Sequence, residues 1–357
     1  MKKIFLIILM FLTTGCYDYV EINDLSFVSA IGIDYENDTY KLTFELLNDT
    51  KKGESSSSQE GYTISGSGPT ISKAFENISL KIAKTPYFYH LKAMVISEDV
   101  AKNHMKEITE YIIRNPKIRN EFYMVLAKDV SAKEIIKNSD KNHPIVGNKI
   151  TKLIDSNNDG YSITFAKPFE DILEKLTNKK ISPVVSVLTL DNEEIKALGL
   201  GIFENFNYKY TITPLQSSYL NMLLNEPSQF LVSHKYDGKI LAIELSDGNV
   251  DYEFKNRKIY INVTLDAEIV ENMPEFDLRK NEVYKKIEED FSKRIASDLE
   301  ELINLFVQNN TDAVGFENLY YKKYRQQNPN ILQKYDVEIN VKVSINKKGL
   351  IYEVDYE

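Results

Sequence analysis

The chain has 357 residues, a formal net charge of −9, 43% apolar residues and 27% charged residues. An acidic balance of this size argues against nucleic-acid binding, which depends on clustered Lys and Arg. The length predicts two or three domains, and the apolar content suffices for a sizeable core. Because the chain has a single cysteine, it can form no internal disulfide, and its fold must rest on ordinary burial.

The first sixteen residues resemble a bacterial lipoprotein signal. After a short basic start, residues 4–12 form an apolar run that is too short to span a membrane, since a spanning helix needs about 20 residues. Small residues at 13–15 then lead to Cys16, where the cleavage site of a secretory signal is expected. Thr13 departs from the usual signal, which carries Leu three residues before the cysteine. We predict that residues 1–15 are a signal peptide and that Cys16 is lipidated.

Lipidation of Cys16 would hold the chain on a membrane. The cysteine sulfur would take a diacylglycerol, with palmitate as a typical acyl chain. Each buried methylene contributes roughly 0.8 kcal/mol, so two or more chains anchor a protein stably where one chain is marginal. Cleavage would also remove Lys2 and Lys3 and change the net charge from −9 to −11. So acidic a protein is not expected to bind anionic lipid or nucleic acid. The alternative interpretation is a soluble secreted protein with a stray thiol.

The first half of the mature chain alternates strand-like and helix-like stretches. Apolar alternation on either side of a turn predicts a hairpin over 24–49, and the serine-rich stretch 51–61 predicts a flexible loop. The other predicted elements are a helix after Pro69 with Ile71, Ala74, Phe75, Ile78 and Ile82 on one face, a strand followed by a helix that starts at Glu98 and Asp99 and ends before Pro116, a buried strand at 122–127, a helix capped by Ser131, a helix at 168–176 and a strand at 183–190. This mixture of hairpins and βα units predicts the α+β class.

The second half begins after a polar joint at 191–194. A strand at 195–203 and a loop at 203–209 are predicted before a short helix at 214–224. Alternating apolar residues then predict an antiparallel meander with strands at 230–234, 240–245, 250–254 and 258–269 and Asp-Gly turns at 237–238 and 247–248.

A long amphipathic helix over about 274–308 follows the meander. Its single apolar stripe consists of Val283, Ile287, Phe291, Ile295, Leu299, Leu302 and Phe306. A second helix at 316–327, a strand at 337–345 and an edge strand at 350–356 are predicted after it. We therefore divide the chain into the signal peptide at 1–15, an N-terminal α+β region at 16–192 that could hold two subdomains, and a C-terminal α+β domain at 193–357.

Residues suited to catalysis or metal binding are few and dispersed. The four histidines, His90, His104, His143 and His234, lie far apart, and no H-x-x-x-H or C-x-x-C spacing occurs. The chain has no G-x-S-x-G, Walker A or complete G-x-G-x-x-G motif. The lone G-x-G at 66–68 is better explained as a turn before a helix than as a phosphate site. We expect His90 to be structural, and we predict no catalytic residue, no cofactor and no metal site.

Two further clusters have surface or packing interpretations. The carboxylate run at 288–290 is expected on the solvated outer face of the long helix. Tyr320, Tyr321 and Tyr324 stand among Lys and Arg, but the acidic balance of the whole chain argues against a nucleic-acid platform. A protein interface and core packing are equally good interpretations of these tyrosines.

The stretch GCYDYVEINDLSFVSAIGID, residues 15–34, resembles the start of mature Ger(x)C proteins, the C subunits of spore germinant receptors. Tyr17 departs from the pattern, because the family usually has Trp there. The stretch at 61–79 is similar to the family's strand, glycine and helix, and the stretch at 90–129 is similar to its most recognisable part. The matching residues are Cys16, Asp18, Glu21, Ile22, Asp24, Leu25, Gly32, Asp34, His90, Leu91, Lys92, Glu98, Ala101, Arg114 and Arg119. The C-terminal half is a weaker match, although its order of elements fits.

The resemblance implies an elongated, multi-domain α+β lipoprotein with mixed and antiparallel sheets packed by helices and without known enzymatic activity. It implies a lipid-anchored protein on the extracytoplasmic face, at the outer leaflet of the spore's inner membrane. It also implies association with two integral membrane subunits, A and B, in a complex that responds to nutrients and leads to ion and dipicolinate release. The expected partners are therefore those subunits and the membrane, without nucleic acid and without direct binding of a small molecule.

Two other classes of protein begin with a similar signal. A solute-binding lipoprotein of an importer would build two doubly wound lobes, and the antiparallel run at 230–269 argues against them. A wall-active hydrolase would need an acid–base pair or a metal site, which the sequence does not reveal. We therefore expect a non-enzymatic, lipid-anchored subunit of a nutrient germinant receptor.

Overall fold

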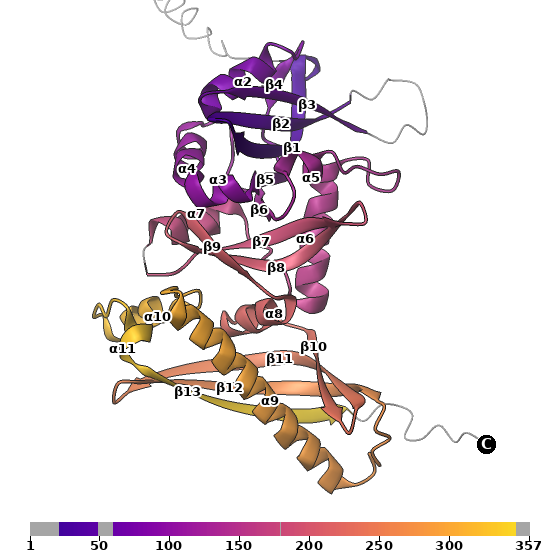
Figure 1. Ribbon diagram of the computed structural model, residues 1–357, viewed down its shortest axis with the longest axis vertical. Coiled ribbons are helices and arrows are strands. Elements are labelled where there is room, and N and C mark those ends of the chain that lie inside the picture. Colours follow the sequence, from indigo (N-terminus) through magenta and orange to yellow (C-terminus); the bar gives the residue numbers. More distant parts are fainter. Residues whose placement is uncertain (1–20, 49–59, 179, 348–357) are drawn as a thin grey trace, which may run out of the picture.

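The computed structural model describes residues 21–48, 60–178 and 180–347. Two sheets follow one another along the long axis of the molecule, and helix α8 (Pro214–Leu223) lies between them (Figure 1). The predicted α+β class and the mixed-sheet, multi-domain architecture are confirmed. Within the described ranges, the helices are too short or too polar to cross a bilayer.

The first sheet has nine strands in the order β3-β2-β1-β5-β6-β7-β8-β9, with β4 paired to β1. A parallel centre of β1, β5, β6 and β7 is flanked on both sides by antiparallel strands, and the predicted first hairpin is confirmed as β1 and β2. The bounds are β1 Leu25–Glu36, β2 Thr39–Leu47, β3 Gly61–Gly68, β4 Thr85–Tyr87, β5 Ala93–Ser97, β6 Tyr123–Ala127, β7 Val184–Asp191, β8 Glu194–Glu204 and β9 Asn207–Ile212.

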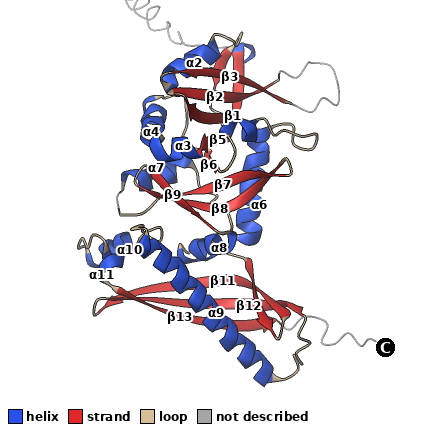
Figure 2. Ribbon diagram, viewed as in Figure 1, coloured by secondary structure: helices blue, strands red, loops and turns tan. Residues whose placement is uncertain are grey.

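Helices cover both faces of the first sheet (Figure 2). Because successive strand residues point to opposite faces, β5 buries Met94 and Ile96 on one side and Ala93 and Val95 on the other. The first face is covered by α2 (Ile71–Ser79), α3 (Glu98–Asn103), α4 (Met105–Arg114) and α7 (Phe169–Thr177), and the second by α5 (Ala132–Ile136) and α6 (Val146–Tyr161).

Helix α6 begins against β1 at a position where a glycine is required. The backbone N–H of Gly147 donates to Glu45 Oε2 at 2.8 Å. A Cβ atom on Gly147 would lie only 2.6 Å from the carbonyl oxygen of Ser29 on β1. Since Cβ atoms do not approach backbone oxygens so closely, any larger residue would push the helix away from the strand.

We expect Gly147→Ala to lower the free energy of unfolding by roughly 1–3 kcal/mol, the range typical of overpacking. Gly160→Ala in the same helix is the matched control, because nothing lies within 4 Å of the added Cβ. Alanine is also the better helix former by up to about 1 kcal/mol. Urea-unfolding midpoints of both variants check this prediction. Equal midpoints would mean that β1 moves to admit the added methyl group without a loss of stability.

The second sheet has four strands in the order β10-β11-β12-β13, with β13 parallel to β12 and the other pairs antiparallel. Its strands are β10 Phe230–Tyr236, β11 Lys239–Lys255, β12 Lys258–Asn272 and β13 Asp336–Lys347. The predicted long helix is α9 (Asn281–Gln308), which crosses the sheet, and α10 (Phe316–Tyr324) and α11 (Ile331–Lys334) lead from it to β13 (Figure 1).

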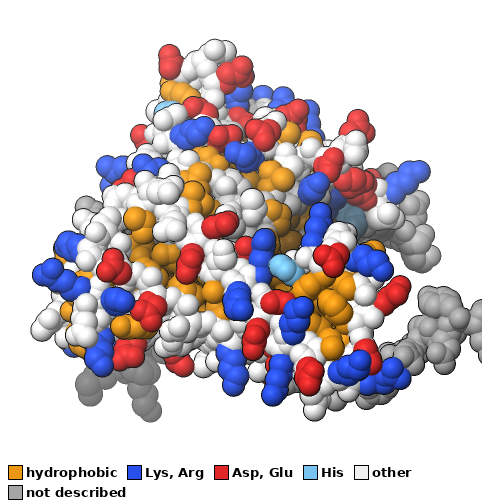
Figure 3. All heavy atoms as spheres, turned by 60° about the horizontal axis from the view of Figure 1, so that its bottom comes forward, with side chains coloured by type: hydrophobic (Ala, Val, Ile, Leu, Met, Phe, Trp, Pro, Cys, Tyr) orange, Lys and Arg blue, Asp and Glu red, His pale blue; other side chains and the backbone are white. Residues whose placement is uncertain are grey.

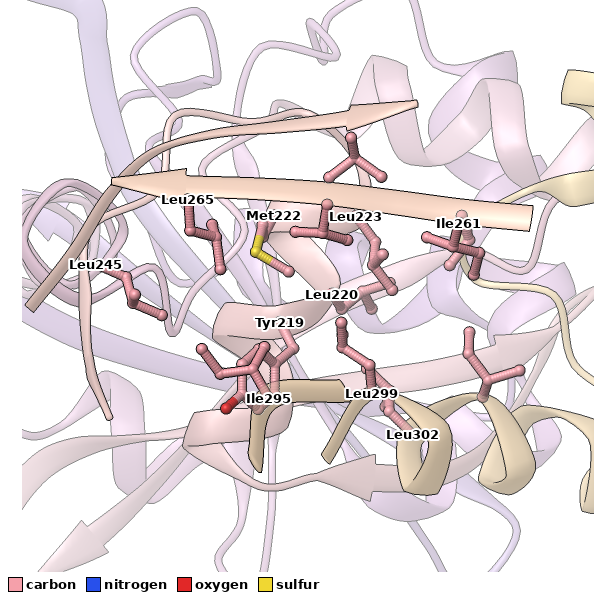
Figure 4. Packing of buried hydrophobic residues seen from close by; sticks show 14 of the residues in the cluster. Tyr219, Leu220, Met222, Leu223, Leu245, Ile261, Leu265, Ile295, Leu299 and Leu302 are labelled. Atoms are coloured by element: carbon pink, nitrogen blue, oxygen red, sulfur yellow. The ribbon is translucent and has the colours of Figure 1, made fainter. Parts of the chain in front are cut away.

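Helix α8 joins the two sheets through one continuous core. Leu220 and Leu223 of α8 lie in one cluster with the strand residue Ile261 and the α9 residue Leu299 (Figure 4). The same core includes buried side chains of β7, β8 and β9 in the first sheet. Asn221 adds a polar link, because its side-chain N–H group donates to backbone oxygens of residues 162 and 164 at 2.7 and 2.8 Å. The two halves of the described chain are therefore packed together rather than merely connected.

The predicted turn at 247–248 is wrong. Strand β11 continues through these residues, and its register against β12 shifts between Ser246 and Asn249. An extra residue in one strand is accommodated as a bulge that bends the strand without reversing it. The two strands predicted at 240–245 and 250–254 are consequently one long strand.

Other boundaries also differ from the prediction. The stretch at 203–209 contains a tight turn and the start of β9 rather than a continuous loop. The long helix starts at Asn281 rather than near 274, and the helix expected over 98–115 is divided into α3 and α4 at His104. Helix α6 was not predicted, because its Asn, Asp and Gly residues lower its intrinsic helix propensity.

Residues Asn192 and Glu193 form the two-residue turn between β7 and β8, and both have positive φ. The division of the chain at 192 and 193 stays a prediction about sequence units, since the first sheet continues through this turn to β9. The edge strand predicted at 350–356 and most of the loop predicted at 51–61 lie outside the described residues.

Candidate functional site

The predicted lipidation site, Cys16, lies outside the described residues, and its role stays a prediction. The described chain starts at Glu21, which is followed by a short 3-10 helix, Ile22–Asp24, and then by β1. β4, which pairs with the start of β1, lies at the upper end of Figure 1. The described chain therefore starts near one end of the long axis, a few residues after Cys16 in the sequence.

A cleft of about 790 Å³ lies where strands β1, β5 and β6 end. The strand ends contribute Glu36, Ser97 and residues 129–131, and Lys41 of β2 and Ser67 of β3 line the cleft as well. Ligands in open α/β sheets often bind outside the carboxyl ends of parallel strands. This cleft is thus the natural place to look for chemistry in the first half.

Three of the carboxylates that line this cleft, Glu36, Glu98 and Asp99, have partners close by in the sequence. Glu36 pairs with Lys41 across the first hairpin, and Glu98 accepts a hydrogen bond from Lys102 at 2.6 Å, one turn along α3. Asp99 similarly accepts from the Asn103 side chain at 2.8 Å. These carboxylates stabilise the elements that carry them, and their geometry gives no support for acid–base catalysis.

Two carboxylates of the first hairpin cap helices on the second face of the sheet. Asp34 accepts the backbone N–H groups of Ala132 and Lys133 at 2.8 and 3.0 Å, where α5 begins. Glu45, which is 1% exposed, accepts from Gly147 where α6 begins. Burial raises the pKa of both carboxyl groups, and the backbone donors oppose that rise. Both side chains therefore hold helices onto the sheet.

Asp312 makes the corresponding contact in the second half. Its carboxylate accepts the backbone N–H groups of Gly315, Phe316 and Glu317 at 2.7 to 3.0 Å, at the start of α10. Its own backbone N–H donates to Ser182 Oγ at 2.8 Å, just before β7. Burial raises the pKa of the Asp312 carboxyl to about 6, although the three backbone donors work against the rise. Asp312 thus ties α10 to the first half.

The raised pKa of Asp312 predicts a pH-dependent stability. The ordinary pKa of an aspartate is 3.8, so between that pH and about pH 6 the Asp312 carboxyl is protonated in the folded chain and ionised in the unfolded chain. The stabilisation from this group is complete below the unfolded pKa and is lost as the pH rises through about 6. From about pH 4 to about pH 7, the wild type should lose on the order of 3 kcal/mol relative to Asp312→Asn.

Urea-unfolding midpoints of the wild type and Asp312→Asn across this pH range check the prediction. Asp277→Asn is the control, because Arg279 lowers the pKa of the half-buried Asp277 carboxyl to about 2 and places its titration below the range. If the midpoints of the wild type and of Asp312→Asn changed in parallel with pH, the Asp312 carboxyl would have an ordinary pKa and the prediction would be wrong.

Three of the four histidines, His90, His104 and His234, take part in ring packing, whereas His143 lies 3.4 Å from the Asp140 carboxylate. The ring of His104 lies 3.8 Å from that of Tyr35, and its Nδ1 is 3.3 Å from the Tyr40 hydroxyl. His90 lies edge-on to Phe27 at 5.4 Å. Across 21–48, 60–178 and 180–347, no three His, Cys, Asp or Glu side chains are grouped to hold a metal ion. The structural role expected for His90 agrees with its ring contact and stays a prediction.

Tyr320 and Tyr324 pack on the second sheet. The Tyr324 hydroxyl donates to the carbonyl oxygen of Phe254 at 2.9 Å, and the Tyr320 ring lies edge-on to the Phe254 ring at 5.4 Å. Tyr324 remains 39% exposed. Of the two interpretations that the sequence left open for these side chains, the structure therefore favours packing.

The expectation that residues 288–290 are simply solvated is wrong for two of them. Glu288 Oε1 accepts the backbone N–H of Ile345 on β13 at 2.9 Å, and Asp290 accepts the Tyr236 hydroxyl at 3.1 Å. Within the described residues β13 is an edge strand, and the N–H groups along such an edge need acceptors. Helix α9 supplies two of them, Glu288 Oε1 for Ile345 and Ser292 Oγ for Val343, the latter at 3.0 Å.

The arrangement defines an elongated α+β protein with two sheets in series, joined by a buried helix. The family model for the spore germination protein N-terminal domain matches residues 18–190, and the model described as spore germination B3/GerAC like, C-terminal, matches residues 198–349. The chain therefore belongs to the GerAC-like family of spore germination proteins, the family identified from its sequence.

Relatives and a solved structure agree with this assignment. Spore germination protein KC of Bacillus subtilis is 24% identical over 98% of this chain and 95% of its own length. Spore germination protein GerQC of Bacillus cereus is 22% identical over 91% of each chain. The crystal structure of the GerBC protein superposes with a TM-score of 0.59 at 16% identity, covering 89% of this chain and 97% of that one. The structural likeness establishes the shared fold.

Proposed function

We propose that the chain is a lipid-anchored, non-enzymatic subunit of a nutrient germinant receptor that is required for spore germination. The observation that carries the proposal is the pair of family matches, which together extend from residue 18 to residue 349. In this role the chain acts together with two integral membrane subunits, A and B. Nutrient recognition by the complex then leads to germination.

The proposed attachment point is Cys16, exposed as the first residue after cleavage of residues 1–15. Support comes from the order of the basic start, the apolar run and the small residues before the cysteine. The acyl chains would hold the body on the extracytoplasmic face, at the outer leaflet of the spore's inner membrane. Because Glu21 follows Cys16 by five residues, the described body starts within about 18 Å of the lipid.

The proposed mode of action is docking. An anchor confines the body to one leaflet, where its effective concentration near a membrane partner is high even if the contact itself is weak. Glu36 pairs with Lys41 and Glu98 with Lys102 in the cleft where β1, β5 and β6 end. These pairs support a structural role for those charges rather than a role in ligand binding. No nutrient needs to bind this subunit for it to act in this way.

The second candidate is a solute-binding lipoprotein, and the cleft of about 790 Å³ at the carboxyl ends of β1, β5 and β6 favours it. Against it stands the second sheet, which has three antiparallel strands and one parallel edge strand instead of a second doubly wound lobe. The two candidates differ in whether the chain alone binds a nutrient.

Thermal unfolding of residues 16–357 with millimolar amino acids, sugars and nucleosides separates these candidates. A ligand at 100 times its dissociation constant stabilises a fold by about 2.7 kcal/mol. This would raise the melting temperature of a protein of this size by a few degrees. We expect no shift. A reproducible rise with one nutrient would make this subunit a sensor and would contradict action by docking alone.

A further inference from the structure

Two large apolar side chains near one end of the molecule are highly exposed. Leu80 and Ile22 are 76% and 72% exposed, the highest values for large hydrophobic residues in the part of the chain that the structure describes. Ile22 begins the short 3-10 helix that precedes β1, and Leu80 lies between α2 and β4. α2 and β4 are both found at the upper end of Figure 1. Grouped exposed apolar side chains mark interaction surfaces.

Aromatic rings of β4 and of the residues after it stack on one another at the same end. The Tyr87 ring lies edge-on to Phe27 at 5.5 Å and stacks on the Tyr89 ring at 4.9 Å. The guanidinium of Arg119 lies 4.2 Å above the Tyr89 ring, which is 42% exposed. Tyrosine has an apolar ring and a polar hydroxyl, which suits the boundary between water and hydrocarbon. We call Ile22, Leu80, Tyr87, Tyr89 and Arg119 the anchor-side surface.

This end is positively charged although the chain is acidic. The segments at 21–27, 84–92 and 111–121 hold five Lys or Arg residues and three Asp or Glu residues. Their net charge is +2, whereas the whole chain has −9. The stretch at 77–97 contains three lysines and no acidic residue. The overall charge therefore hides a local basic region.

The chain length places this surface close to the anchor. Ile22 follows Cys16 by six residues, and an extended chain advances by at most about 3.6 Å per residue. Ile22 thus lies within roughly 22 Å of the cysteine in any conformation of the connecting residues. A lipidated Cys16 would hold the exposed apolar and aromatic side chains within reach of the headgroups.

We infer that the anchor-side surface lies directly on an anionic lipid surface, with Ile22, Leu80 and Tyr89 at headgroup level. Lys and Arg residues of the same end, Arg119 among them, face the lipid phosphates. The inference rests on the proposed lipid anchor, and it adds an orientation to it. The anchor alone leaves the body free to rotate, whereas a second point of contact fixes which face meets the membrane.

The orientation has a consequence for the rest of the molecule. The long axis points away from the membrane, and the second sheet becomes the part farthest from the lipid (Figure 1). Figure 3 shows this far end, where Lys and Arg side chains are interspersed with Asp and Glu around several hydrophobic areas. Such a mixed surface lacks the single-sign charge that attracts a protein to anionic lipid.

The test uses the absence of tryptophan from the chain, because a single introduced tryptophan then reports only on its own surroundings. Tyr89→Trp places the reporter on the anchor-side surface. Tyr161→Trp is the matched control, since Tyr161 is 53% exposed at the end of α6, beside α8. Each variant of residues 16–357 is coupled through Cys16, the sole cysteine, to a maleimide lipid in vesicles that contain phosphatidylglycerol and brominated lipid.

We expect the Tyr89→Trp emission to shift to the blue and to be quenched by bromine at least about threefold more strongly than that of Tyr161→Trp. The quenching should fall by about half in neutral phosphatidylcholine vesicles or when Lys117→Glu and Arg119→Glu are added. Circular dichroism of the charge-reversed variant checks that it is folded.

Equal quenching of the two reporters on vesicle-bound protein would overturn the inference and would leave this surface to a protein partner. Equal quenching of Tyr89→Trp in anionic and neutral vesicles would overturn the choice of anionic lipid. The chemical coupling makes both results independent of processing in cells. Mass spectrometry showing an unlipidated Cys16 in the native host would contradict the proposed function without affecting either result.

Discussion

Replacing Cys16 by alanine should abolish both lipid attachment and signal cleavage and release the chain from membranes. Two acyl chains of palmitate length bury enough methylenes to contribute on the order of 20 kcal/mol at about 0.8 kcal/mol each. No comparable anchor remains, because the apolar run at 4–12 is shorter than the roughly 20 residues that a spanning helix needs. Detergent phase separation of the protein from its native host, together with the mass of its N-terminus, measures the effect.

Tyr17→Trp is the control for this experiment, since it changes the neighbouring residue and leaves the sulfur in place. It should be lipidated and cleaved as the wild type is. A Cys16→Ala variant that is cut at the same site and still enters the detergent phase would contradict the lipoprotein assignment.

The largest effect on stability is expected for Leu220→Ala in α8. Leu220 is fully buried in the core that unites the first sheet, the second sheet and α9 (Figure 4). Removing its isobutyl group leaves a cavity that elements from both halves must line, and such changes cost about 2–5 kcal/mol. Denaturant unfolding of residues 16–357 should show this loss as a lower midpoint.

Leu231→Ala on β10 provides the matched control, because Leu231 is 48% exposed and loses little buried area. Its effect should stay within about 0.5 kcal/mol. If Leu220→Ala were as mild as Leu231→Ala, the contact between the halves through α8 would be loose. In that event the first and second sheets would behave as separate units.

Much of the first half could be predicted because its signals are local. Ser131 was identified as an N-cap from its position after a buried strand, and it forms a capping box with Glu134. The hairpin of β1 and β2 follows from alternating apolar residues around a turn. Helix α6 could not be found in this way, because its start depends on Glu45, about a hundred residues earlier in the chain.

The second half was harder to predict because its pairing is not local. The parallel pairing of β13 with β12 joins residues nearly 80 positions apart, and no turn signal announces it. The Asp-Gly pair at 247–248 is the common signature of a hairpin, yet it lies in a bulge within β11. The apolar stripe of α9 was correct, since residues from Ile287 to Phe306 are buried at helical spacing.

The candidate site divides in the same way. The lipidation of Cys16 is predicted from a signal that is entirely local. It stays a prediction, because Cys16 lies outside the residues that the structure describes. The anchor-side surface was missed, because exposure of Ile22 and Leu80 appears only once the chain is folded. The acid-free stretch at 77–97, within an acidic chain, is the signal that could have revealed it.

Nutrient-triggered release of dipicolinate from spores tests the central claim most directly. The measurement uses a strain in which this chain is the sole remaining member of its family, compared with strains that lack it or carry Cys16→Ala. A lipid-anchored receptor subunit predicts release with the wild-type chain, and a rate lower by at least about tenfold in both other strains, because anchoring supplies the effective concentration needed for docking. Equal release with and without the chain would contradict its assignment as a required subunit of a germinant receptor.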